Sequence, residues 1–136
     1  MGTMLHRTIA SLSLGALMAG GAVALVATPA SAAWNSCTAN YACMWKNQDY
    51  PNGPNALFAS ALPGLSTSDN LIKSVVNRGY TSSVRFYDGS DYTGDSFLMN
   101  HEGNTSGVQW RDPFLANGTD TTSVNWSNKI SSGRFW

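Results

Sequence analysis

Apolar and polar positions divide the chain into one long apolar stretch, residues 9–26, and a series of short alternating stretches. Val84 and Phe86 alternate with polar residues as in a strand with one buried face, and residues 96–98 resume an apolar run after a turn. The later part of the chain is also rich in Gly, Asn, Ser, Thr and aromatic residues, which favour strands and turns over helices. The pattern predicts an all-β domain.

One hairpin motif is well defined. Tyr87 and Tyr92 stand five positions apart, and Gly94 follows two residues later. Between the rings, Asp88 and Gly89 form a strong turn signal. Gly94 is expected to take a backbone conformation that a side chain would resist, which lets one ring cover the turn. We interpret the motif as fold-determining rather than catalytic.

The same arrangement occurs earlier in the chain. Trp45 and Tyr50 have the same spacing, and Gly53 is displaced by one position. Each copy is followed by a turn in which an Asn precedes a Ser by four positions, at residues 69–75 and 127–133. Two copies predict two similar β units packed together, because one four-stranded unit alone could not bury its apolar face. Tyr50 and its counterpart in the second copy are expected to cover their hairpins.

The second unit is longer than the first, and its extra residues fall between Met99 and Val124. This segment is polar and rich in glycine. Function on a compact scaffold often lies in such a loop. The alternative is that its apolar residues simply pack into the core.

Residues 1–32 have the features of a signal peptide. Arg7 ends a short polar head, the apolar stretch follows, and residues 30–32 give the small-x-small pattern that signal peptidases recognise. A retained membrane anchor is the alternative, since the stretch is nearly long enough to span a bilayer. Pro29 and the glycines within the stretch favour cleavage. We therefore predict a secreted, extracellular domain of residues 33–136 that has no membrane association after cleavage.

Both cysteines, Cys37 and Cys43, follow the predicted cleavage site. In an exported protein each is the obvious disulfide partner of the other, and closing so small a loop stabilises the fold by roughly 2 to 3 kcal/mol. A metal site is the alternative, but it lacks further ligands because His101 is the only histidine after residue 32.

Charge and composition argue against several functional classes. The chain has eight Lys and Arg and eight Asp and Glu, so it offers no electrostatic reason to expect nucleic acid as a partner. His101 and Glu102 are adjacent and could not both face one side of a strand. The sequence lacks the nucleophile elbow, the zinc-binding helix motif and the phosphate-binding glycine loop. We predict that the protein is not an enzyme and requires no cofactor, with a Ser–His–Asp arrangement as the alternative.

The paired motifs resemble βγ-crystallin-like domains, which are β-sandwiches of two Greek-key units. The resemblance extends over essentially all of residues 33–136. Within that superfamily, the Cys-x5-Cys loop running into Cys43-Met44-Trp45-Lys46-Asn47 is similar to an actinobacterial family of secreted peptidase inhibitors, whose founding activity is inhibition of metalloproteinases. The inhibitor for which that family is known braces its reactive loop with a second disulfide, and this chain has no further cysteine.

The resemblance implies a secreted, monomeric inhibitor that offers a rigid loop to the cleft of an extracellular protease, in particular a metalloproteinase. We expect that loop in residues 101–118. The candidate contact residues are His101, Trp110, Phe114 and Leu115. Alternative functions are a calcium-binding or structural secreted protein and a toxin-like or cell-wall-binding module.

βγ-crystallin-like domains bind calcium by pairing the Asn/Asp turn of one unit with the Ser/Thr side chain of the other, so the resemblance also implies calcium. One site would combine Asp69 and Asn70 with Ser131, all of which offer oxygen ligands. The other would place Lys73 beside residues 127 and 128, where its ammonium group replaces a hydroxyl ligand. We expect at most one weak calcium site, and the alternative is that the turns are only hydrogen-bonded corners.

Overall fold

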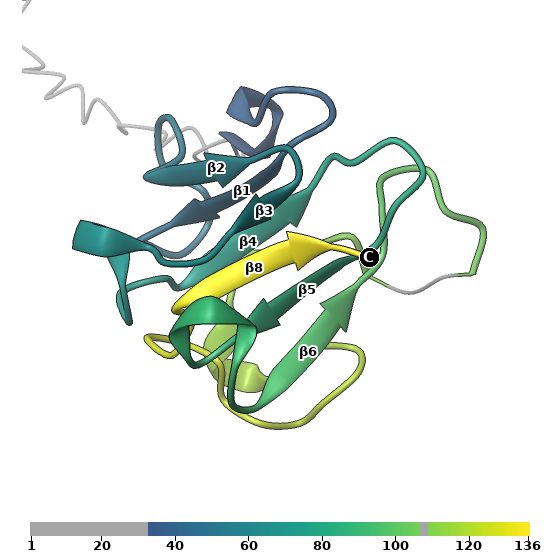
Figure 1. Cartoon of the computed structure of the whole chain (residues 1–136). Helices are drawn as coiled ribbons and strands as arrows, with labels where there is room; N and C mark the ends of the chain where they lie inside the picture. Colours follow the sequence, from purple (N-terminus) through teal and green to yellow (C-terminus); the bar gives the residue numbers. More distant parts are fainter. Residues whose placement is uncertain (1–32, 107–108) are drawn as a thin grey trace, which may run out of the picture.

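The structure is a computed structural model that describes residues 33–106 and 109–136, so the predicted signal peptide lies outside the described residues. The described residues form two antiparallel sheets of four strands each (Figure 1). One sheet has the order β2-β1-β4-β7 and the other β3-β8-β5-β6. The strands are Ala42–Trp45 (β1), Ala56–Phe58 (β2), Ala61–Leu62 (β3), Ser74–Asn77 (β4), Val84–Tyr87 (β5), Ser96–Met99 (β6), Arg111–Asp112 (β7) and Ser132–Phe135 (β8). Short 3₁₀ turns cover Ala33–Ser36 (η1), Ser66–Ser68 (η2), Ser90–Tyr92 (η3) and Leu115–Asn117 (η4).

Each repeated unit supplies four consecutive strands, and its third strand crosses to the other unit's sheet. β3 of the first unit pairs with β8, and β7 of the second unit pairs with β4. The motif positions pair in register, since Trp45 lies opposite Ser74 and Tyr87 lies opposite Ser132. The predicted all-β sandwich of two units is therefore confirmed, and neither unit completes a sheet alone.

The two central strands of the first sheet, β1 and β4, are buried on both faces. Met44 of β1 packs in the main core between the sheets, together with apolar residues of both units. Cys43 and Trp45 point to the opposite face, where Cys37 and Tyr50 complete a second, smaller apolar cluster. Alternate residues of one strand therefore serve two separate cores.

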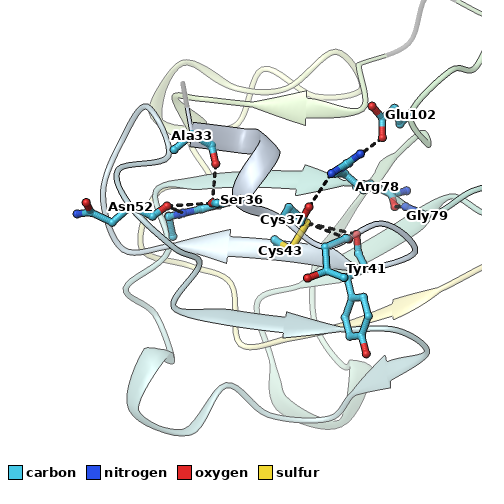
Figure 2. The surroundings of a disulfide bond; sticks show 12 residues. Ala33, Ser36, Cys37, Tyr41, Cys43, Asn52, Arg78, Gly79 and Glu102 are labelled. Atoms are coloured by element: carbon cyan, nitrogen blue, oxygen red, sulfur yellow. Dashed lines mark hydrogen bonds and ion pairs between the residues drawn. A yellow bond between two sulfur atoms is a disulfide. The ribbon is translucent and has the colours of Figure 1, made fainter. Parts of the chain in front are cut away.

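The predicted disulfide between Cys37 and Cys43 is present and holds the N-terminal segment over the outer face of the first sheet (Figure 2). The two Cα atoms are 5.8 Å apart, and both side chains are buried. Next to the bond, Trp34 of η1 packs edge-to-face on Trp110, with 5.2 Å between the ring centroids. The bond thus fixes the segment that covers the second cluster.

Both aromatic hairpins contain the predicted ring pairs. The ring centroids of Trp45 and Tyr50 are 5.2 Å apart, and those of Tyr87 and Tyr92 are 5.9 Å apart, each pair meeting edge-to-face. Tyr50 is buried whereas Tyr92 is only half-buried. The first hairpin is therefore covered more completely than the second.

Gly94 has a φ of +79°, so the prediction that it takes a conformation unfavourable for a side chain is confirmed. In the first hairpin the same place, two residues after the tyrosine, is held by Asn52 with a φ of +62°. Asn is the side-chain-bearing residue that best tolerates this left-handed region. The neighbouring Gly53 is not among the residues of positive φ and does not fill that role.

Replacing Tyr50 by Ala is expected to lower the free energy of unfolding by about 3 to 5 kcal/mol, because a ring that is 1% exposed leaves a cavity in the second cluster. Tyr50→Phe is the matched control and should retain stability, since the hydroxyl has no hydrogen-bond partner among the described residues. Replacing the half-buried Tyr92 by Ala should lower the free energy of unfolding by less, roughly 2 kcal/mol. Urea denaturation followed by tryptophan fluorescence measures all three, and a greater loss for Tyr92→Ala would contradict this assignment of the rings.

Candidate functional site

The two Asn turns predicted from the sequence meet at the junction of the units and exchange backbone hydrogen bonds. The amide of Asn70 donates to the carbonyl of Ile130 at 3.0 Å, and the amide of Asn128 donates to the carbonyl of Ile72 at 2.8 Å. Both asparagines have positive φ, 53° and 60°. The exchange links the end of one unit to the end of the other through two equivalent corners.

The first corner brings together the three side chains predicted to bind calcium. Ser131 Oγ donates to Asn70 Oδ1 at 3.5 Å, and Asn70 Nδ2 donates to Asp69 Oδ2 at 3.3 Å. Asp69 and Asn70 are exposed, and Ser131 is buried beside them. A carboxylate, an amide oxygen and a hydroxyl at one exposed turn are a donor set that suits a hard cation.

Lys73 occupies in the second corner the position that Ser131 has in the first. The amide of Lys73 donates to the carbonyl of Trp45 at 2.8 Å, and the amide of Ser131 donates to the carbonyl of Tyr87, also at 2.8 Å. The backbone geometry is thus equivalent while the side chain is cationic. Lys73 therefore brings an ammonium group to the second corner where Ser131 brings a hydroxyl to the first.

The segment predicted to contact a protease, residues 101–118, does not form one continuous surface. β7 pairs antiparallel with β4, which places the residues before β7 at the Asn77 end of β4 and the residues after it at the Ser74 end. Accordingly, the carbonyl of Trp110 accepts a hydrogen bond from the amide of Asn77 at 2.8 Å. Leu115, after β7, donates instead to the carbonyl of Lys73 at 3.1 Å.

The four predicted contact residues are therefore separated. Leu115 is fully buried in the core between the sheets, so the alternative that it packs into the core holds, and it offers no side chain to a partner. His101 and Trp110 lie at the Asn77 end and are half-buried. Trp110 packs against the second cluster. Phe114 lies at the Ser74 end and is 38% exposed.

Beside Phe114 is a surface hollow of about 310 Å³ that the sequence did not indicate. Its most buried acidic residue is Asp112, which is 2% exposed and accepts a hydrogen bond at Oδ1 from the amide of Phe114 at 2.8 Å. Burial raises the pKa of the Asp112 carboxyl above its usual range, the hydrogen bond from Phe114 opposes this, and the charge of Asp120 raises the pKa further. The Asp-Pro dipeptide at 112–113 signals a turn. The sequence does not show that Asp112 is buried, because its burial depends on the pairing of β7 with β4.

Residues 30–99 match the model of peptidase inhibitor family I36. The chain belongs to this family. Membership in family I36 supports a peptidase inhibitor rather than an enzyme, implies a protease as its partner, and agrees with the resemblance identified from the motifs. Among the described residues, no helix has both the length and the apolar character needed to cross a bilayer.

Solved βγ-crystallin structures share the fold of this I36 chain. A βγ-crystallin from Ciona intestinalis aligns with a TM-score of 0.51 at 9% identity, over 71% of this chain and 99% of that one. A βγ-crystallin from an archaeon aligns with a TM-score of 0.52 at 17% identity, over 73% and 100% of the two chains. A structure described under the evolution of the eye lens βγ-crystallin domain fold aligns with a TM-score of 0.56 at 11% identity, over 74% of this chain and 88% of that one. These likenesses confirm the predicted fold class. The comparison with curated proteins found no match to the sequence.

Asp112→Asn is expected to raise the free energy of unfolding at pH 7, because the amide keeps an acceptor for Phe114 while removing a buried charge. A pKa that is raised in the folded state means that folding favours the protonated carboxyl. The penalty of ionised Asp112 is therefore present above the folded pKa and fades as the pH falls towards the unfolded value. The difference between variant and wild type should be larger at pH 7 than at pH 4.

Urea denaturation at the two pH values measures this difference. Asp120→Asn, which removes an exposed acidic residue of the same hollow, is the matched control and should change stability less. If Asp112→Asn were less stable than the wild type at pH 7, the ionised carboxylate would be making a favourable interaction.

Proposed function

We propose that this I36 chain inhibits a secreted metalloproteinase by placing a rigid surface loop in the protease cleft. The observation that carries the proposal is the match of residues 30–99 to a peptidase inhibitor family. The resemblance to a secreted family whose founding activity is metalloproteinase inhibition supports the choice of target. A scaffold with two sheets around the main core and a disulfide over the outer face of the first sheet loses little conformational entropy on binding, which favours tight inhibition.

The 101–118 segment offers two separate contact surfaces to such a protease. One includes His101 and Trp110 at the Asn77 end of β4, and the other includes Phe114 at the Ser74 end. At the second surface the backbone is held on both sides, since Asp112 accepts from the amide of Phe114 and the following amide donates to the carbonyl of residue 73. A single protease cleft would engage one end of the molecule.

The purified protein at micromolar concentration is expected to inhibit thermolysin in the cleavage of a short peptide substrate. The serine protease subtilisin serves as the control for target class and should be inhibited more weakly. Steady-state rates at increasing inhibitor concentration give the inhibition constant for each enzyme. Unchanged thermolysin activity at micromolar protein would reject the proposal, and preferential inhibition of subtilisin would retain an inhibitor but reject the metalloproteinase target.

We also propose one weak calcium site at the first corner, held by Asp69, Asn70 and Ser131. The support is that these three side chains are linked by hydrogen bonds at one turn and together carry a carboxylate, an amide oxygen and a hydroxyl. A calcium ion there would bridge the two units electrostatically and stabilise the folded state by mass action. Lys73 is expected to prevent binding at the equivalent corner.

Isothermal titration of the chelator-treated protein should give no more than one calcium site, which Asp69→Ala and Ser131→Ala should both remove. Lys73→Ser restores a hydroxyl at the second corner and is expected to add a second site. Thermal denaturation with and without calcium gives an independent readout. Two equivalent sites in the wild type would contradict the role of Lys73, and no binding at all would mean that the turns are hydrogen-bonded corners only.

A further inference from the structure

Tyr80 is the most exposed large hydrophobic residue among those described, with 83% of its surface accessible. It lies in the connection between β4 and β5, residues 78–83, which joins the two Greek-key units. Figure 1 shows this connection projecting from the same end of the molecule as the segment that follows β6. A ring this exposed makes no contribution to the two apolar clusters.

The base of this connection is closed by one buried side chain, that of Asn77. Its Oδ1 accepts from the amide of Gly79 at 2.8 Å, and its Nδ2 donates to the carbonyl of Ser82 at 3.0 Å. Nδ2 also donates to the carbonyl of Asn100 at 2.9 Å. The backbone is therefore held on both sides of Tyr80, and the loop is tied to the segment that follows β6.

Arg78 fixes the same connection from its outer side. Its Nη1 donates to the carbonyl of Cys37 at 2.7 Å, and its Nε forms an ion pair with Glu102 Oε2 at 2.8 Å (Figure 2). The loop is thereby attached to the disulfide-bonded segment. Arg78 is also the only charged residue within 78–83, so its pairing leaves the surroundings of the exposed ring without an unpaired charge from the loop.

The backbone at Gly79 lies directly against the ring of Phe135, and a Cβ there would meet that ring and the side chain of Asn77. On either side of Tyr80 is a surface hollow, one of about 220 Å³ towards Glu102 and one of about 230 Å³ towards Phe135. Tyr80 lines both hollows, and most of its surface remains accessible. Its shape is convex and uncharged, which fits a concave apolar pocket.

We propose that Tyr80 enters the apolar specificity pocket of the inhibited protease, and that the contact surface is the 78–83 connection together with the His101 end of the neighbouring segment. This inference rests on the proposed function. Residues 30–99, which match the inhibitor family, include all of the 78–83 connection, whereas both His101 and Phe114 lie outside them. A tyrosine on a fixed backbone buries a large area with few torsions to order, which is the character of a binding anchor.

The inference is tested by measuring the inhibition constant against thermolysin for the wild type and four variants. Tyr80→Ala is expected to weaken inhibition by at least about tenfold, the loss typical of an anchor residue. Tyr80→Phe should remain within about twofold of the wild type, because the ring itself fills the pocket. Leu57→Ala, which truncates an exposed apolar side chain of β2 outside the proposed contact surface, is the matched control and should leave inhibition unchanged. Phe114→Ala, the fourth variant, probes the opposite end.

Urea denaturation of Tyr80→Ala should give the wild-type midpoint, because an exposed ring adds little to stability. A loss of inhibition without a loss of stability therefore supports a contact role. Undiminished inhibition by Tyr80→Ala, or a loss confined to Phe114→Ala, overturns this inference while the proposed function stands. A wild-type protein that does not inhibit thermolysin overturns both.

Discussion

The two Greek-key units are held together by exchanged strands, and the rest of the structure depends on that exchange. β3 completes the sheet of the second unit and β7 completes the sheet of the first. The corner hydrogen bonds from Asn70 to Ile130 and from Asn128 to Ile72 close the same junction. Because one four-stranded unit could not bury its apolar face alone, both units must fold together for the core to form. Every surface loop is consequently mounted on one cooperative scaffold rather than on two hinged halves.

The repeated order of the sequence, aromatic hairpin then Asn turn then Ser, reflects hydrogen bonds that fold each hairpin onto its sheet. Ser74 Oγ donates to the carbonyl of Asn47 at 2.7 Å, and Ser132 Oγ donates to the carbonyl of Gly89 at 2.6 Å. Both hydroxyls are completely buried, so their donors need these partners. The repeated motif is therefore structural. These hydrogen bonds do not restrain the connections between the strands, which are free to differ between the two units.

The sequence predicted the features that are local or repeated: the aromatic hairpins, the Asn turns and the disulfide. It did not predict the second apolar cluster, because burial of Trp45 on the outer face depends on where the N-terminal segment lies. Nor did it predict that His101 and Phe114 lie at opposite ends of β4, since this follows from the antiparallel pairing of β7 with β4. The exposure of Tyr80 was not predicted either, because composition alone does not distinguish an exposed aromatic residue from a buried one.

A loop that enters a protease cleft must resist being opened and released, and for residues 78–83, the contact proposed here, the hydrogen bonds to Asn77 would supply that resistance. If residues 78–83 left their place, the buried amide of Asn77 would lose partners, and each unsatisfied group costs about 1 to 3 kcal/mol. Opening of the loop is thus coupled to disruption of the core around β4 rather than to a local fluctuation. The bonds to Gly79 and Ser82 lie on opposite sides of Tyr80, so a cut peptide bond between them would leave both ends attached to the same side chain. On the proposed contact, the strength of inhibition therefore depends on the burial of Asn77 as much as on the ring that the loop presents.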